Sequence, residues 1–164
     1  MATSRSHTYG CRLEWRSGPA EAGGSMEDYS REHTVAASGG KAPLKLSAAP
    51  EFRGDPALMN PEELFVAALS SCQMLTYLAL AARAGVRVVS YMDDAAGTLA
   101  PGRHPATGRS VMRIERVLLR PRIEVASGSD TAKAKDLVEK AHETCFIANS
   151  VGCEVAAEPE VRVV

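Results

Sequence analysis

The residues best suited to chemistry in this chain are its cysteines, at positions 11, 72, 145 and 153. They form no Cys-x-x-Cys pair, so neither a zinc ribbon nor a thioredoxin-type motif is present. Cys72 and Cys145 fall on apolar faces of the two segments that we predict to be long helices. With a cation nearby, one of them would be held as a thiolate, the nucleophilic form of cysteine. Surrounded by hydrocarbon alone, each would be an inert small apolar residue, and both interpretations stay open on position alone.

Other chemistry has weaker support in the sequence. The histidines are scattered, and although His142 and Cys145 lie one helical turn apart, two ligands do not make a metal site. No glycine-rich turn between a strand and a helix is present to bind phosphate. We therefore expect no metal and no cofactor. Cys11, on an early edge strand, and Cys153, at the start of the last strand, are expected to be structural.

Length and composition set further limits. The chain has 164 residues, of which 45% are hydrophobic and 24% are charged, which predicts a single folded domain over residues 1–164. The net charge of −1 argues against nucleic-acid binding through a basic surface. Residues 1–10 lack the apolar core of a signal peptide, so we expect a cytoplasmic protein, in which persistent disulfides are uncommon.

The segment that carries Cys72 has unusually clear helix signals. Asn60 is a favourable N-cap, Pro61 suits the first helical position, and Gly85 marks the end. Residues 64–82 carry no charge and approach the length of a bilayer span. Polar residues at the middle of the run and its many alanines favour a buried central helix over a membrane segment.

The remaining elements predict an α+β fold. A second helix is expected at 130–146, with strands at 8–16, 27–37, 44–47, 86–99, 111–125 and 154–163. In the strand at 111–125, apolar and charged side chains alternate, with Val117, Leu119, Ile123 and Val125 on one face. The resulting order, βββ-α-ββ-α-β, indicates antiparallel sheets with two long helices rather than a doubly wound parallel sheet.

Two segments resemble a known family. Asn60-Pro61-Glu62-Glu63-Leu64, followed by Ala67-Ala68-Leu69-Ser70-Ser71-Cys72, is similar to the first-helix signature of the OsmC/Ohr thiol peroxidases. The segment from Ala141 to Ser150 looks like the part of that family that carries the resolving cysteine. The resemblance covers about residues 27 to 164, which leaves 1–26 as an amino-terminal strand and variable loop.

The resemblance implies roles for individual residues. Cys72 would be the peroxidatic cysteine and Cys145 the resolving one. Glu62, ten residues before Cys72, would orient an arginine that keeps Cys72 ionised. Arg31 is the best match for that arginine and Arg53 the alternative, and either could instead be a solvated surface residue.

The resemblance also implies partners. The substrate would be an organic hydroperoxide, an external thiol or dithiol would be the reductant, and the protein would form an intertwined homodimer without a membrane or nucleic-acid partner. We expect the organic group to contact apolar residues near Cys72, which could equally be ordinary core: Phe65, Met74, Tyr77 and Phe146.

The sequence departs from the best-known branch of the family at Phe146 and resembles a less-studied OsmC-like branch more, from which it departs in turn at Gln73. The best-known branch begins its resolving segment with Cys-Pro, whereas Cys145 is followed by Phe146, and Gln73 stands where many OsmC-like members carry a histidine. Two other functions therefore remain open: a non-catalytic protein that binds a small apolar ligand, and a slow redox sensor.

Overall fold

The computed structural model describes residues 6–18, 25 and 27–164, in two compact units with a boundary after Pro61. Each unit is described by itself. Most of the glycine- and alanine-rich stretch expected between the first two strands, residues 19–24, lies outside the described residues. The expectation of one domain over residues 1–164 stays a prediction.

The amino-terminal unit contains a small antiparallel sheet of β1 (Cys11–Glu14), β2 (His33–Ala37) and β3 (Leu44–Leu46), with β2 in the middle. A 3-10 turn, η1, follows at Pro50–Phe52. The strands are shorter than the ranges 8–16 and 27–37 that we predicted. Asp28 accepts hydrogen bonds from the hydroxyl and backbone N–H of Ser25, which makes a turn at the place where the longer strand was expected.

In the carboxy-terminal unit, α1 spans Pro61–Ala84, as predicted. The helix ends where Gly85 adopts a φ of 73°, a left-handed conformation that glycine reaches without strain. By length and composition, α1 is apolar enough to cross a membrane, a test that the core helix of a soluble protein also passes. The described residues fully bury only one stripe of it, Leu69, Gln73, Tyr77 and Ala81, which leaves other apolar parts of the helix without cover within one chain.

The second helix, α2, spans Thr131–Thr144, and the side chain of Asp130 caps it by accepting a hydrogen bond from the N–H of Lys133. It ends two residues earlier than predicted because Cys145 is extended, with φ −68° and ψ 119°. A second 3-10 turn, η2, follows at Ala148–Ser150. Cys145 therefore lies at the carboxy-terminal cap of α2 rather than inside the helix.

Within the described chain, four strands separate the two helices, where we predicted two: β4 (Val88–Asp93), β5 (Ala96–Arg103), β6 (Ser110–Leu119) and β7 (Pro121–Val125). The final segment also divides, into β8 (Glu154–Ala157) and β9 (Glu160–Val163). Breaks fall beside Pro121 and Pro159, because proline cannot donate to a strand ladder.

The six strands form two sheets, in the orders β4-β7-β9 and β5-β6-β8. The β4–β7 and β5–β6 pairs are antiparallel, as predicted, whereas the β6–β8 and β7–β9 pairs are parallel, so both sheets are mixed. The α+β class itself is confirmed.

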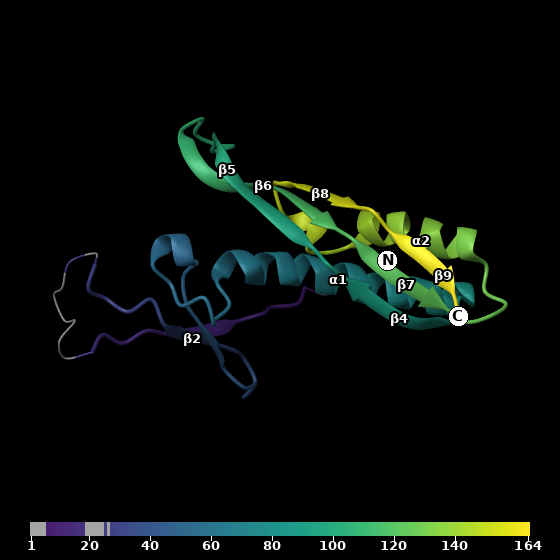
Figure 1. The fold of residues 1–164 in the computed structure, drawn as a ribbon, viewed down its shortest axis with the longest axis horizontal. Coiled ribbons are helices and arrows are strands. Elements are labelled where there is room, and N and C mark those ends of the chain that lie inside the picture. Colours follow the sequence, from purple (N-terminus) through teal and green to yellow (C-terminus); the bar gives the residue numbers. More distant parts are fainter. Residues whose placement is uncertain (1–5, 19–24, 26) are drawn as a thin grey trace. The chain divides into compact units, whose positions relative to one another are not determined.

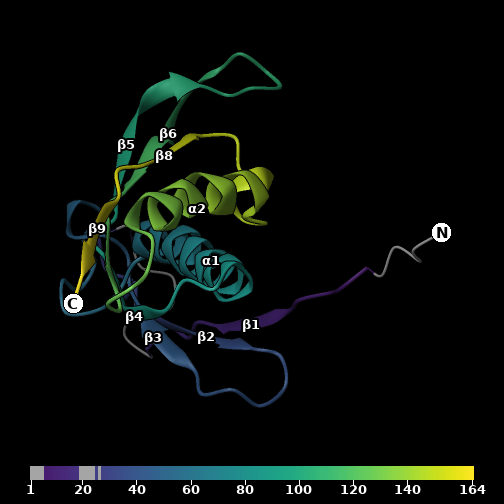
Figure 2. The same ribbon diagram turned by 90° about the vertical axis from the view of Figure 1, so that its right-hand side faces the viewer.

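The alternating residues Val117, Leu119, Ile123 and Val125 are all buried, as predicted. Ile123 and Val125 pack with buried residues of both helices, and Val117 and Leu119 pack with Leu69 of α1. The two helices lie side by side on the same side of the strands of this unit (Figures 1 and 2). This packing brings the middle of α1 to the carboxy-terminal end of α2.

Candidate active site

The structure brings Cys72 of α1 and Cys145, at the end of α2, into hydrogen-bond contact through their side chains. All four cysteines, which lie in the described part of the chain, are free thiols. Cys72 is half-buried, whereas Cys145 is completely buried, at 0% exposure. The site is thus a reduced dithiol with one accessible sulfur and one enclosed sulfur.

The Cys72 thiol has a pKa below the ordinary value for cysteine. Burial acts to raise this pKa, but hydrogen bonds outweigh burial, in decreasing order of effect from the N–H of Ile147, the Cys145 thiol, the N–H of Phe146 and Thr76. The two N–H groups and the Cys145 thiol can donate hydrogen bonds to sulfur, and a thiolate accepts such bonds better than a thiol does. The Thr76 hydroxyl, whose effect is the smallest, donates to the Cys72 carbonyl at 2.9 Å. Cys72 is therefore the cysteine that ionises more readily.

The Cys145 thiol has a pKa above the ordinary value. Burial is the main cause of the raised pKa. A hydrogen bond from the backbone at Ala148 is the next largest effect and opposes burial, and the hydrogen bond and negative charge of a Cys72 thiolate then raise the pKa further, against a small opposing effect of the backbone at Ile147. Since the charged form is disfavoured, Cys145 keeps its proton and can donate it toward Cys72. The pair therefore divides into a thiolate-forming and a thiol-retaining member.

The turn that follows Cys145 supplies the backbone donors and is held in place by Asn149. The Asn149 side-chain Nδ2 donates to the carbonyl oxygens of Glu143 and Cys145, each at 2.9 Å, and its backbone N–H donates to Cys145 at 3.0 Å. Sequence analysis missed this turn because the apolar pattern continued the helix through Phe146. The signal that could have found it is the pair Asn149-Ser150, since both residue types favour turns.

The four apolar residues expected to contact substrate lie in different surroundings. Tyr77 is fully buried in the core between the helices, with its ring centroid 5.7 Å from that of Tyr91. Phe65 packs against the other core cluster, and Met74 is half-buried. Phe146 is 82% exposed, while its N–H points at the Cys72 sulfur. Of the four, Phe146 is thus the residue whose backbone contacts the Cys72 sulfur.

The carboxylate expected to act with the arginine, Glu62, is half-buried in the first turn of α1. Ten residues of helix separate it from Cys72 by roughly 15 Å at about 1.5 Å per residue. Within α1 it therefore does not touch the sulfur, and any influence on Cys72 must pass through another group.

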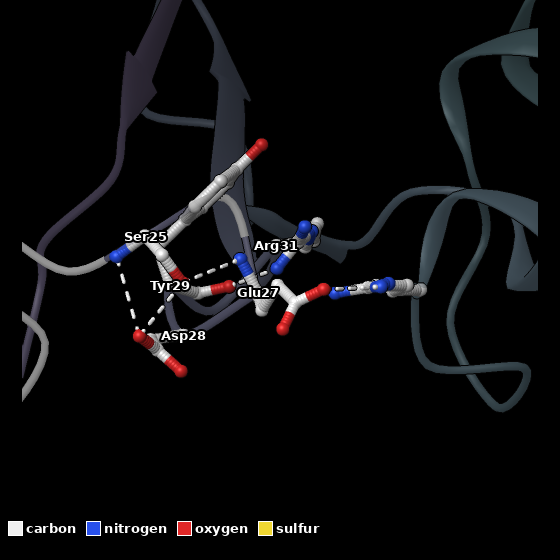
Figure 3. Close-up of polar contacts among 6 residues, drawn as sticks. Ser25, Glu27, Asp28, Tyr29 and Arg31 are labelled. Atoms are coloured by element: carbon white, nitrogen blue, oxygen red, sulfur yellow. Dashed lines mark hydrogen bonds and ion pairs between the residues drawn. The ribbon is translucent and has the colours of Figure 1, made fainter.

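Both candidate arginines belong to the amino-terminal unit. The guanidinium of Arg31 lies 3.9 Å from the centroid of the Tyr29 ring and donates to the Tyr29 carbonyl (Figure 3). Arg53 pairs with Glu27 at 3.1 Å, and both side chains are more than half exposed. Both arginines lie in the unit that does not contain Cys72, and their action on Cys72, together with that of Glu62, stays a prediction.

Arg31 also borders a pocket of about 430 Å³ within the amino-terminal unit. Aromatic and aliphatic side chains dominate its lining, which comprises Leu13, Trp15, Tyr29, Ser30, Arg31, His33, Ser47, Ala48 and Pro61. Trp15 and Tyr29 meet edge to face there, with centroids 6.3 Å apart. Arg31 is therefore held beside an apolar surface, whereas Arg53 lies in an exposed ion pair.

Among the described residues, no group of three or more His, Cys, Asp or Glu side chains could hold a metal ion.

Comparisons with known proteins agree with the resemblance seen in the sequence. Residues 54–160 match the family model described as OsmC-like protein. A solved OsmC-like protein of unknown function from Vibrio cholerae O1 biovar eltor is 34% identical, covers 94% of this chain and 100% of its own, and superposes with a TM-score of 0.84.

Two more distant structures show the same fold. An organic hydroperoxide resistance protein OsmC from Legionella pneumophila is 23% identical, covers 96% of this chain and 98% of its own, and has a TM-score of 0.64. An organic hydroperoxide resistance protein from Elizabethkingia anophelis is 20% identical, with coverage of 99% and 100% and a TM-score of 0.64. No curated protein matches the chain. The family model covers more than half of the sequence, and the chain belongs to the OsmC/Ohr family.

Proposed function

We propose that the protein is a thiol-dependent peroxidase that reduces organic hydroperoxides to alcohols, with Cys72 as the peroxidatic and Cys145 as the resolving cysteine. One observation carries the proposal: a half-buried thiol with a lowered pKa accepts a hydrogen bond from a buried thiol with a raised pKa. A nucleophile and its resolving partner need these opposite properties.

In the first step, the Cys72 thiolate attacks the terminal oxygen of the hydroperoxide and the O–O bond breaks. The sulfur becomes a sulfenic acid, and the organic group leaves as an alkoxide that takes up a proton to form the alcohol. Arg31 is the proposed cation that keeps Cys72 ionised and stabilises the alkoxide, oriented by Glu62. Arg53, which already pairs with Glu27, is the alternative.

In the second step, the Cys145 sulfur attacks the Cys72 sulfenic acid and a disulfide forms. The Cys145 proton leaves with the sulfenic oxygen as water, so the step needs no further oxidant. An external thiol or dithiol then reduces the disulfide by thiol–disulfide exchange, which returns both cysteines to their starting state. Because such reductants act in reducing compartments, we propose a cytoplasmic location.

The proposed preference for organic peroxides rests on apolar contacts. The related proteins from Legionella and Elizabethkingia are named organic hydroperoxide resistance proteins. Contacts with Phe65, Met74 and Phe146 would favour an organic group by roughly 0.8 kcal/mol per buried methylene. Tyr77, the fourth expected residue, is fully buried and has no free surface for such a contact. The exposed Phe146 ring has the greatest area to cover, and hydrogen peroxide cannot gain from it.

The proposed homodimer is supported by the surface of α1. Leu75, at the level of Cys72, is 61% exposed, and Ala67, Ala68 and Ala79 are exposed as well. A second copy of the chain would cover this apolar surface. Sedimentation of the purified protein should therefore give twice the chain mass of 17.4 kDa.

The proposal is tested by following cumene hydroperoxide and hydrogen peroxide separately with dithiothreitol as the reductant. We expect continuous turnover, faster with cumene hydroperoxide. Consumption of one equivalent followed by a halt would favour a redox sensor. No consumption at all, with unmodified cysteines, would favour a non-catalytic ligand-binding protein and contradict the proposal.

A further inference from the structure

Gln73 places a primary amide inside the contact between the two helices. Its side chain is completely buried, at 0% exposure, and Nε2 donates to the backbone carbonyl of Val138 at 2.9 Å. The amide oxygen Oε1 is buried without a hydrogen-bond partner among the described residues. The side chain therefore satisfies only part of its hydrogen-bonding capacity.

A residue of this kind is costly for the fold. A buried polar atom without a partner has lost its contacts with water and gained nothing in return. An apolar side chain of similar volume, such as methionine, would fill the same space without leaving Oε1 unpaired. A buried polar group that lowers stability can still select one arrangement of packed helices over others, because only one register satisfies it.

Gln73 lies where the packing of α2 on α1 also sets the distance between the Cys72 and Cys145 sulfurs. Gln73 directly follows Cys72 in α1, and Val138 lies seven residues, about two turns, before Cys145. A side-chain hydrogen bond from Lys133 Nζ to the Ala84 carbonyl, at 2.7 Å, also joins the two helices, but it lies far from the thiols. Sliding or rotation of α2 on α1 would break the Gln73 contact and carry Cys145 away from Cys72.

We propose that Gln73 is a positioning residue that fixes the register of α2 on α1 and so sets the reach of Cys145 to Cys72. It acts through its bond to the Val138 backbone and touches neither the peroxide nor the reacting oxygen. The inference rests on the proposed function in one respect, the pairing of Cys72 with Cys145. It predicts that Gln73 governs disulfide closure, and that its loss also raises the pKa of Cys72, because the donors to the Cys72 sulfur lie at the end of α2.

The test uses an equilibrium that needs no peroxidase activity. The full chain is incubated with mixtures of reduced and oxidised glutathione. Cys72 attacks oxidised glutathione and releases one glutathione thiolate, and Cys145 then displaces the second, so two electrons pass to glutathione for each protein disulfide formed. The equilibrium constant reports the effective concentration of one thiol at the other.

We expect Gln73→Met to lower this constant roughly fivefold, the factor expected for loss of one buried hydrogen bond. Gln73→Asn, whose shorter arm cannot reach Val138, should show a similar loss. Thermal unfolding of reduced Gln73→Met should occur at or above the wild-type temperature, because the unpaired oxygen is gone. Alkylation of Cys72 by iodoacetamide at a fixed pH below its pKa should slow in the same variant, because the donors to its sulfur shift together with Cys145.

Ser70→Ala is the matched control. Ser70 also lies near Cys72, but its hydroxyl joins α1 to Asp93 of β4 at 2.6 Å rather than to α2, so its removal should leave the glutathione equilibrium within twofold. The positioning role of Gln73 would be overturned by an equilibrium constant equal to that of the wild type in Gln73→Met or Gln73→Asn, or by an equal loss in Ser70→Ala. Either result would leave the proposed function unaffected. A wild-type chain that forms no Cys72–Cys145 disulfide would overturn the proposed function together with it.

Discussion

Cys72 and Cys145 are the same type of residue, but they lie in different surroundings. Cys72 lies within a helix and is half-buried, and its sulfur accepts hydrogen bonds from the backbone of the turn after α2. Cys145 lies at a helix end, fully buried, and the largest influence on its thiol is loss of water. The pKa is lowered at the first site and raised at the second. Backbone donors and burial, rather than residue type, thus separate a thiol of lowered pKa from a thiol of raised pKa.

The largest expected effect comes from removing the thiolate-forming member. Cys72→Ser should lower the consumption of cumene hydroperoxide by dithiothreitol by more than about 1000-fold, since a hydroxyl does not ionise near neutral pH and loss of a nucleophile has effects of this size or larger. Cys153→Ser is the matched control and should retain wild-type activity. If Cys72→Ser kept more than a tenth of the wild-type activity, Cys72 would not be the nucleophile.

Removing Cys145, the proposed resolving cysteine, should have a smaller and qualitatively different effect. In Cys145→Ser, the Cys72 sulfenic acid should accumulate after one equivalent of peroxide, because the intramolecular attack is lost. Turnover with dithiothreitol should slow by about 10- to 100-fold, since an external thiol lacks the advantage of proximity. Trapping with dimedone and measuring the protein mass checks this. Absence of the trapped adduct in Cys145→Ser would contradict the assigned order of events.

The dependence on pH tests the hydrogen bond between the thiols. Because the pKa of Cys72 lies below the ordinary cysteine value, its reaction with iodoacetamide should persist as pH falls through the range in which exposed thiols become protonated. Cys145→Ala removes one donor, so the pKa of Cys72 should rise and alkylation at a fixed pH below it should slow. The midpoint of rate against pH is the measurement. If the midpoint pH of the alkylation rate moved downward in Cys145→Ala, the inference that the Cys145 thiol donates to the Cys72 sulfur would be wrong.

The smallest effect concerns the turn after Cys145. Asn149→Ala should cost about 1 kcal/mol of unfolding free energy through its lost hydrogen bonds and should raise the pKa of Cys72, because the donors at Phe146 and Ile147 are held less firmly. Thr144→Val is the control: the Thr144 hydroxyl donates to the Lys140 carbonyl at 2.8 Å within α2 and does not hold the turn. Denaturant unfolding and the alkylation profile check both. An unchanged dependence of the alkylation rate on pH in Asn149→Ala would show that the turn keeps its donors in place without the Asn149 hydrogen bonds.

Local signals in the sequence were sufficient for much of the fold. Asn60-Pro61 and Gly85 placed both ends of α1, because caps and breakers act over a few residues. The alternation from Val117 to Val125 identified a buried face even though the chain breaks into two strands beside Pro121. The parallel β6–β8 and β7–β9 pairs were not predicted, because pairing across tens of residues depends on both partners and leaves no mark on either strand.

The candidate site was predictable only where local sequence signals exist. The two cysteines could be selected from their helices and from the family motifs. The helical pattern extended through Phe146, however, and hid the turn in which the backbone donors of Phe146 and Ile147 meet the Cys72 sulfur. The single-residue register set by Gln73 and Val138 likewise depends on how two helices pack, which no local pattern encodes.

The most direct test of the pairing is the mass of the protein after one equivalent of cumene hydroperoxide. We predict the loss of two hydrogens and, after digestion without reductant, a peptide in which Cys72 is joined to Cys145. An unchanged mass, or a disulfide that joins Cys72 to Cys11 or Cys153 instead, would contradict the account.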